Sequence, residues 1–270
     1  MKICFIGGGN MATALIGGLL AQGFKASDFS VVEINADNRA RLTAQFGVCS
    51  CADLADGITG CDTIVLAVKP QQLHQVAVLL APRLTGQLLI SIAAGIRASD
   101  LARWANSSAV VRAMPNTPAL IQAGMTGLFA LSNVSAAQRS QAEQILAAVG
   151  KTLWLQDEAM LDAVTAISGS GPAYVFYLIE AMQAAAMELG FNAADARLLS
   201  QETFLGAAKL AIASDDEVAI LRQRVTSKNG TTERALLSLE ANHVKQHIIS
   251  AAHAAAARSA EMGDELGAAT

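Results

Sequence analysis

Short apolar runs alternate with helical patterns along the first part of the chain. The run at residues 63–68 is almost continuously apolar, and the segment that follows it, at 70–80, repeats apolar residues at helical spacing. We predict strands at residues 3–7, 30–34, 63–68, 88–92, 109–113, 128–131 and 152–155, and helices at 11–22, 37–46, 70–80 and 136–149. This alternation is typical of right-handed crossovers and of a parallel sheet with helices on both faces.

The pattern changes after about residue 156. From residue 157 onward it is helical and rich in Ala and Leu, which favour helices, and no convincing strand follows. Breaks are expected at residues 168–172, 190, 214–216 and 227–230. We therefore predict an α/β domain over residues 1–156 and an all-α domain over residues 157–270. The last long helix, expected at 244–262, is apolar enough on one side to form either core or the interface with a second subunit.

Composition and charge narrow the class of protein. The chain has 270 residues, enough for two domains, and its 19 basic and 23 acidic residues give a net charge of -4 without a basic cluster, which argues against nucleic-acid binding. The uncharged run at 3–24 is long enough to span a bilayer, but Gly7–Asn10 and Gly17–Gly18 interrupt it, as expected for a buried strand and helix. We predict a cytoplasmic protein that binds no membrane and has no cleaved signal peptide.

A glycine motif follows the first predicted strand and opens the first predicted helix. Gly7, Gly9 and Ala12 give the pattern G-x-G-x-x-A. In a dinucleotide-binding turn the first glycine permits the bend, the second lets the pyrophosphate approach the backbone, and the small third residue lets the helix pack on the strand. The N-terminus of the helix then faces the phosphates. The motif in this context predicts a Rossmann-like dinucleotide-binding domain.

The end of the second predicted strand should lie beside the ribose 2′ position of the dinucleotide. Glu33 is suited to accept a hydrogen bond from a 2′-hydroxyl, which would favour NAD. Asn35, Arg39 and Arg41 follow at once and are suited to hold a 2′-phosphate, although both arginines also fit a solvated helix face. The sequence leaves the choice of cofactor open, and we take NADPH as the expected cofactor with NADH as the alternative.

Three further loops follow predicted strands at the edge where a cofactor would lie. They are Ala67–Pro70, the small-residue segment 91–95, and the rigid two-proline loop 112–118, in which Asn116 is suited to orient a nicotinamide or substrate or to serve the loop itself. The predicted cofactor-binding residues are Ile6, Gly7, Gly9, Asn10, Met11, Asn35, Arg39, Ala67, Val68, Lys69, Pro70, Ala93, Ala94 and Asn116.

The helical half contains two polar turns that are candidates for binding a substrate. The segment 168–173 precedes a long helix and places Pro172 where a first helical residue would be. The polar segment 225–233 opens another helix, and hydroxyls around a helix N-terminus suit a carboxylate. Thr231 or Thr232 would equally serve as a helix cap.

Cysteines and histidines give no metal site. The cysteines at positions 4, 49, 51 and 61 include a CxC rather than the CxxC spacing of zinc sites, so we interpret them as reduced core residues of an intracellular protein. His243 and His247 stand four residues apart, but no other ligand completes a set, and a surface helix is the simpler interpretation.

The same motifs resemble, in order and spacing, those of the pyrroline-5-carboxylate reductase family. The most specific piece is VTSKNGTTERALLSLE at 225–240, supported by the glycine motif, AVKP from Ala67, MPNTP from Met114 and SGSGPAY from Ser168. The resemblance covers nearly the whole chain, to about Met262. One departure is that many relatives have Pro-Gly where this chain has Lys228-Asn229; Asn tolerates positive φ, so the turn remains plausible.

The resemblance implies a two-domain enzyme that reduces 1-pyrroline-5-carboxylate to L-proline with NAD(P)H, in the last step of proline biosynthesis. Its all-α part would be a dimerisation domain like that of 6-phosphogluconate dehydrogenase, with interlocking helices, a site between chains, and dimers that could build a decamer. By similarity Thr232 would be catalytic and donate to the ring nitrogen. The implied substrate-binding residues are Glu158, Ser227, Gly230, Thr231 and Thr232, with Asp215 a weaker candidate.

Two other functions remain open at this point. A 3-hydroxyacid dehydrogenase of similar plan would carry a lysine in the helix after its second-domain glycine motif, and the segment 172–189 has none. No histidine lies in the loops expected around the nicotinamide, so a proton donor for a developing alkoxide is missing, whereas an imine can arrive protonated. A nucleotide-binding regulatory module without catalysis is the second alternative, and the intact threonine segment argues against it.

Overall fold

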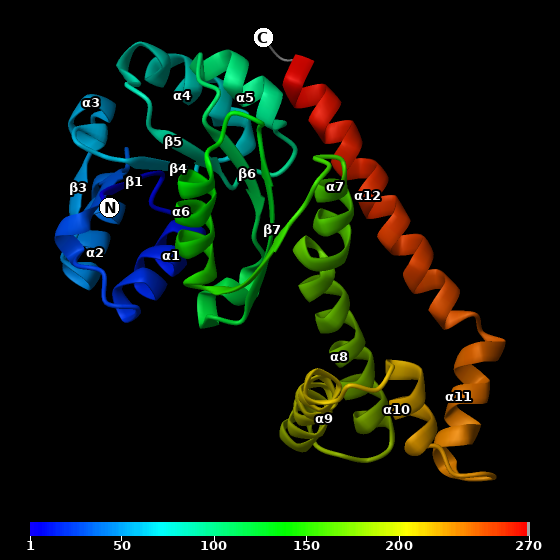
Figure 1. Ribbon diagram of the computed structural model, residues 1–270. Coiled ribbons are helices and arrows are strands. Elements are labelled where there is room, and N and C mark those ends of the chain that lie inside the picture. The colour runs from blue at the N-terminus through cyan, green and yellow to red at the C-terminus, as the bar shows by residue number, and fades with distance from the viewer. Residues whose placement is uncertain (269–270) are drawn as a thin grey trace. The chain divides into compact units, whose positions relative to one another are not determined.

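A computed structural model describes residues 1–268 and divides the chain into two compact units (Figure 1). The first unit contains Met1–Ser170 and the C-terminal segment from Ala254 onward, and the second contains Gly171–His253. The predicted domain boundary after residue 156 stays a prediction. It marks the end of the α/β sequence pattern, whereas the two units are defined by which residues contact one another in space.

The first unit is built on one eight-stranded sheet. In chain order the strands are β1 (Ile3–Ile6), β2 (Phe29–Val32), β3 (Cys49–Cys51), β4 (Thr63–Leu66), β5 (Leu88–Ser91), β6 (Val110–Met114), β7 (Gly124–Ala130) and β8 (Gly150–Trp154). Their order in the sheet is β3-β2-β1-β4-β5-β6-β7-β8. The order reverses between β1 and β4, and in such sheets ligands bind at the carboxyl ends of the strands beside the reversal.

The sheet is not wholly parallel, which corrects the sequence-based expectation. Strand β7 runs antiparallel to β6, while every other neighbouring pair is parallel. Residues 115–123 alone separate β6 from β7. A parallel pairing needs a crossover of about a dozen residues or more, so this connection permits only a reversal of direction.

Helices cover both faces of the sheet (Figure 1). The helices of this unit are α1 (Asn10–Ala21), α2 (Ala36–Phe46), α3 (Leu54–Ile58), α4 (Pro70–Leu80), α5 (Ala98–Ala105), α6 (Ala136–Ala147) and α7 (Met160–Val164), with the end of α12 (Val244–Ala268). Strand β1 shows the principle. Ile3 and Phe5 belong to the core that α1, α2 and α6 complete, and Cys4 and Ile6 to the core that α4 and α5 complete, since alternate residues point to opposite faces.

Three short elements escaped the sequence analysis. Strand β3 has three residues and α3 only five, too few for a periodic pattern. Helix α5 has eight residues and buries Leu101 and Trp104 on one side. The start of α3 does carry a local signal, because the Asp53 side chain accepts hydrogen bonds from the N–H groups of Ala55, at 2.7 Å, and Asp56.

The second unit is entirely helical over its described residues. Its helices are α8 (Gly171–Glu188), α9 (Ala193–Ala213), α10 (Val218–Arg224), α11 (Thr231–Ala241) and the beginning of α12. Asn192 caps α9 as expected, since its side chain accepts from the Asp195 N–H at 3.0 Å. The break predicted at 168–172 is present at Ser170, between a π-helical turn, Thr165–Gly169, and the start of α8.

The cysteines are free thiols, but only one is a core residue. Cys4 is buried in β1, whereas Cys51 and Cys61 are half-buried and Cys49 is exposed at the sheet edge. The pair of histidines also differs from expectation, since His243 adopts a φ of 54° just before α12 and only His247 lies within the helix. In residues 1–268 no helix has the length and apolar character needed to cross a bilayer.

Candidate active site

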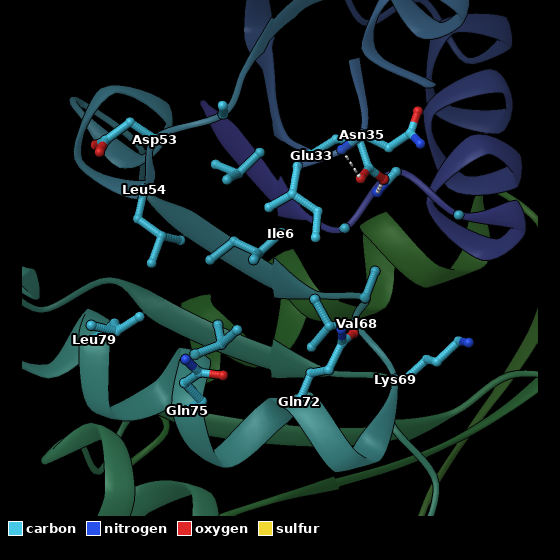
Figure 2. Close-up of a pocket in the computed structure, with 18 of the residues that line it drawn as sticks. Ile6, Glu33, Asn35, Asp53, Leu54, Val68, Lys69, Gln72, Gln75 and Leu79 are labelled. Carbon is cyan, nitrogen blue, oxygen red and sulfur yellow. Dashed lines mark hydrogen bonds between the residues drawn. The ribbon is translucent and has the colours of Figure 1, made fainter. Parts of the chain in front are cut away.

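A cavity of about 740 Å³ opens at the carboxyl ends of β1, β2, β3 and β4. Figure 2 shows its wall, with Glu33 and Asn35 after β2, Asp53 and Leu54 after β3, and Val68 and Lys69 after β4. One side of α4 completes it with Gln72, Gln75, Val76 and Leu79. The cavity lies where the strand order reverses, and its size is that of a cofactor site.

The glycine turn has the geometry that a dinucleotide needs. Gly7 has a φ of +98°, and a Cβ there would lie 2.6 Å from the carbonyl oxygen of Ala67, so only glycine fits. A Cβ on Gly9 would meet nothing within 4 Å, because Gly9 faces open space at the start of α1. Ala12 is fully buried where α1 packs on the sheet. The turn therefore fits a pyrophosphate at the N-terminus of α1.

Glu33 is tied into this turn. Its Oε2 accepts hydrogen bonds from the Gly8 N–H at 3.0 Å and from Asn38 Nδ2 at 3.0 Å, and its Oε1 accepts from the Asn35 N–H at 2.9 Å. Burial alone would raise the pKa of Glu33, but the N–H groups of Asn35 and Gly8 outweigh it and hold the pKa below its ordinary value. Glu33 is a fixed carboxylate at neutral pH.

The two arginines after β2 are held by backbone carbonyls. Arg39 donates from Nη1 to the carbonyl oxygens of Glu33, at 2.7 Å, and Ile34, at 3.0 Å. Arg41 donates from Nη2 to the Gly8 carbonyl oxygen at 3.3 Å and from Nε to Asn38 Oδ1 at 3.0 Å. Arg39 is half-buried and Arg41 is exposed, and neither lines the cavity.

Half of the predicted cofactor residues line the cavity. They are Ile6, Gly7, Gly9, Asn35, Ala67, Val68 and Lys69. The others lie outside the cavity wall, namely Asn10, Met11, Arg39, Pro70, Ala93, Ala94 and Asn116. Asn10 and Met11 begin α1, Pro70 begins α4, and Ala93 and Ala94 follow β5. All of these stay predictions as cofactor contacts.

Asn116 serves its own loop in this structure. Its Oδ1 accepts from the Met125 N–H at 2.9 Å, and its Nδ2 donates to the Ser168 carbonyl oxygen at 3.0 Å. Both ends of the amide are therefore engaged, and the structural role that the sequence left open is present.

Sequence reasoning missed the part of the wall that lies around β3 and α4. Ala52, Asp53 and Leu54 follow β3, a strand that the pattern did not predict, so nothing placed them at the cavity. The exposed face of α4 was predictable from its helical spacing, but without the sheet order no argument assigned it to the cofactor.

A buried arginine organises the surroundings of Glu158. Arg112, in β6, is only 6% exposed in its side chain and donates from Nη1 to Glu158 Oε1 at 3.0 Å, with Asp162 at 3.7 Å. The same Glu158 oxygen accepts from the Ala98 N–H at 2.7 Å, and Ser259 donates to Asp162 at 2.7 Å. The contact of Glu158 with substrate stays a prediction.

We expect Arg112→Met to lower the free energy of unfolding of the first unit by about 2–4 kcal/mol, because it leaves two half-buried carboxylates without their cation. Arg97→Met is the matched control: its ion pair with Asp264 is exposed and should cost below about 1 kcal/mol. Both tryptophans, Trp104 and Trp154, lie in this unit, so urea unfolding followed by fluorescence measures it. Equal losses in the two variants would contradict the assignment.

The turn before α11 holds the predicted substrate residues of the second unit. Asn229 adopts a φ of 60°, as expected of asparagine here, and its N–H donates to the Glu233 carboxylate at 2.7 Å. The Gly230 N–H donates to the Ser227 carbonyl oxygen at 3.0 Å, and a side chain on Gly230 would overlap Ser227 Oγ. The turn therefore brings Ser227 close to the start of the helix.

The expected threonine cap is absent from α11. The N-cap is Gly230, which has no side chain, so no side-chain oxygen caps the helix. Among the described residues, the hydroxyls and N–H groups of Thr231 and Thr232 have no hydrogen-bond partner. First-turn N–H groups beside free hydroxyls form a ready site for a carboxylate and for one further acceptor.

Comparison with known proteins matches both units. A family model described as pyrroline-5-carboxylate reductase dimerisation matches residues 158–262, and one described as NADP oxidoreductase coenzyme F420-dependent matches residues 2–95. The pyrroline-5-carboxylate reductase of Pseudomonas aeruginosa is 48% identical over 268 residues, which is 98% of each chain. The chain belongs to the pyrroline-5-carboxylate reductase family.

Solved structures of this family agree with the fold. A pyrroline-5-carboxylate reductase from Coxiella burnetii superposes with a TM-score of 0.92 at 40% identity, covering 97% of this chain and 98% of that one. The Plasmodium falciparum pyrroline carboxylate reductase, solved with NADP bound, gives a TM-score of 0.87 at 29% identity with the same coverage. The predicted family, fold class and NAD(P)H cofactor class are therefore confirmed.

Proposed function

We propose that the chain catalyses the reaction for which its family is named, the NAD(P)H-dependent reduction of 1-pyrroline-5-carboxylate to L-proline. Family membership makes it an oxidoreductase that acts on a C=N bond. The observation that carries the proposal within the molecule is the turn before α11, where N–H groups and hydroxyls without internal partners stand at a helix N-terminus.

The substrate roles divide along this turn. Ser227 and Thr231 bind the carboxylate through their hydroxyls and the free Thr231 N–H, and Gly230, whose own N–H is bonded to the Ser227 carbonyl oxygen, holds the turn against it. Thr232 donates its hydroxyl to the ring nitrogen, and Glu158 is a further substrate contact. Nothing in the turn is charged except Lys228 and Glu233, so the carboxylate of the substrate is held mainly by neutral donors.

The chemistry asks little of the protein beyond binding and orientation. When bound, NAD(P)H supplies the hydride. The iminium nitrogen has no lone pair, so Thr232 donates its hydroxyl to the lone pair that forms on the nitrogen as hydride reaches the carbon. The turn orients the ring so that one face of that carbon meets the hydride. A strong general acid is unnecessary for an imine that arrives protonated.

Initial rates of NADH and NADPH oxidation with 1-pyrroline-5-carboxylate test this function. We expect turnover with the cyclic imine and none when 3-hydroxyacids are offered with the oxidised cofactors. Turnover of hydroxyacids alone would favour a dehydrogenase, and cofactor binding without turnover of either substrate would favour a regulatory module.

The second unit lacks a core of its own, which supports a homo-oligomer. Over residues 171–253 only Ala196 and Ser200 are buried. Large apolar side chains remain exposed along its helices, among them Phe176, Tyr177, Leu189, Leu198, Leu210, Ile212 and Val218. Such a surface is typical of helices that pack against a second subunit. We place the subunit interface here, in a dimer or in a decamer built of dimers.

Light scattering at micromolar concentration should give a mass of at least twice 27.9 kDa. The melting temperature should also rise with protein concentration, because association stabilises only the folded chain. A monomeric mass with a concentration-independent melting temperature would contradict the proposed interface.

Three predictions accompany this function. Free cysteines suit a reducing compartment and therefore a cytoplasmic location. The net charge of -4 argues against a nucleic-acid partner, and the small-molecule partners are 1-pyrroline-5-carboxylate and L-proline.

A further inference from the structure

Glu33 occupies the position that decides between the two nicotinamide cofactors in Rossmann domains. It directly follows β2 and lines the cavity beside the glycine turn (Figure 2). The residue at the end of this strand lies near the adenosine ribose, where NADPH carries a 2′-phosphate and NADH a 2′-hydroxyl. The family uses NAD(P)H, and the residues beside this ribose determine the relative affinity of this chain for NADH and NADPH.

The carboxylate of Glu33 cannot turn away from the cavity without losing its partners. Three donors hold it: the N–H groups of Gly8 and Asn35, and the side-chain amide of Asn38. Two of them share Oε2 and one bonds to Oε1. A carboxylate oxygen accepts about two hydrogen bonds, so Oε1 keeps one acceptor position. A ribose hydroxyl can donate to that position and an ionised phosphate cannot.

Within the described residues, the cations that follow β2 do not line the cavity in which a 2′-phosphate would lie. Arg39 and Arg41 donate to backbone carbonyls and lie outside the cavity wall. The cations that do line the cavity are Lys69 and Arg83, which follow β4 and α4 rather than β2. Figure 2 shows Lys69 after β4, whereas Glu33 follows β2. A 2′-phosphate would therefore face a fixed carboxylate.

We propose that Glu33 sets cofactor choice in this chain: its carboxylate accepts the adenosine ribose 2′-hydroxyl of NADH and opposes the 2′-phosphate of NADPH. The inference rests on the cofactor cavity alone. It is independent of the roles proposed for the turn before α11, so a failure of one leaves the other standing.

Calorimetric titration with ADP-ribose and 2′-phospho-ADP-ribose tests the proposal without catalysis. Glu33→Gln keeps one acceptor oxygen for the turn and removes the charge. We expect the variant to change the ratio of the two Kd values by about tenfold in favour of the phosphorylated ligand, the size expected from removing one like-charge contact near a surface. A ratio within twofold of the wild-type value, or a shift toward ADP-ribose, would overturn the proposal.

A second arm uses the wild-type protein and stays decisive if the variant folds poorly. ADP-ribose that lacks the adenosine 2′-hydroxyl should bind wild type about five- to tenfold more weakly than ADP-ribose, the value of a hydrogen bond to a charged acceptor. In Glu33→Gln, removal of the 2′-hydroxyl from ADP-ribose should weaken binding by a smaller factor than in wild type. If wild type binds both ligands equally, Glu33 does not hold the hydroxyl and the proposal fails.

Arg39→Gln tests the alternative that Arg39, rather than Glu33, determines cofactor choice. Because Arg39 is bonded to the carbonyls of Glu33 and Ile34, its loss should weaken both ligands by a similar factor. A selective loss of 2′-phospho-ADP-ribose binding in this variant would assign the phosphate to Arg39 and overturn the proposal.

Discussion

Thr232→Ala should lower kcat with 1-pyrroline-5-carboxylate by about a hundredfold while leaving the Kd for NAD(P)H within twofold of wild type. The Thr232 hydroxyl has no partner among the described residues, so its donor is available to the ring nitrogen. Removal of one preorganised donor at a reacting centre costs about 10²–10³ in kcat. The residue lies in the second unit, whereas the cofactor cavity is formed by the first. Steady-state kinetics and fluorescence titration with NADPH and NADH give the two quantities.

Thr232→Ser is the matched control, because it keeps the hydroxyl and removes only a methyl group. It should retain most of the wild-type kcat. If Thr232→Ala lost cofactor binding and turnover to the same extent, Thr232 would not be the partner of the ring nitrogen.

Replacement of Gly9 should separate cofactor binding from folding. A Cβ at Gly9 points into open space and its backbone φ of −72° suits any residue, so Gly9→Val should fold with an unchanged melting temperature. The added side chain occupies the approach of the pyrophosphate, and we expect the affinity for NADH and NADPH to fall at least about a hundredfold, the order of magnitude of two lost charge-assisted hydrogen bonds. Calorimetry and thermal unfolding without cofactor measure the two effects.

Gly7→Ala should behave in the opposite way. Its Cβ would lie 2.6 Å from the Ala67 carbonyl oxygen, and the residue would be held at a φ of +98°. Strain of this kind costs about 1–3 kcal/mol or more, so the melting temperature should fall even without cofactor. A normal melting temperature for Gly7→Ala, or a lowered one for Gly9→Val, would show that the two glycines have been assigned the wrong roles.

The sequence predicted those parts of the fold whose signals are local and strong. The residues of β1, β4 and β5 are buried on both faces, and their continuous apolar runs were sufficient to place them. The glycine turn was predictable because Gly7, Gly9 and Ala12 each meet a separate steric requirement: the bend, the approach of the pyrophosphate, and the packing of the helix on the strand. Strand β3 was missed because it is a three-residue edge strand, and the cavity wall beside it was missed with it.

The remaining differences depend on partners distant in the sequence. Nothing near Glu158 in the chain indicates that Arg112 and the Ala98 N–H would engage its carboxylate. The cap of α11 was predicted from local hydroxyls, but the helix begins at Thr231, so Gly230 takes the N-cap position and both threonines lie in the first turn. Choices of this kind are made by competition between donors and acceptors, which spacing alone does not rank.

The first unit is discontinuous in sequence. Asp264 pairs with Arg97, Ser259 bonds to Asp162, and Leu266 packs against the core that includes Leu101. These residues belong to the last stretch of α12 and are synthesised after the whole of Gly171–His253. Domains usually fold from the N-terminus as the chain leaves the ribosome. Here the sides of α5 and α7 that α12 covers must wait for the final turns of polypeptide to emerge, so a nascent chain stalled before residue 254 should be protease-sensitive around these two helices.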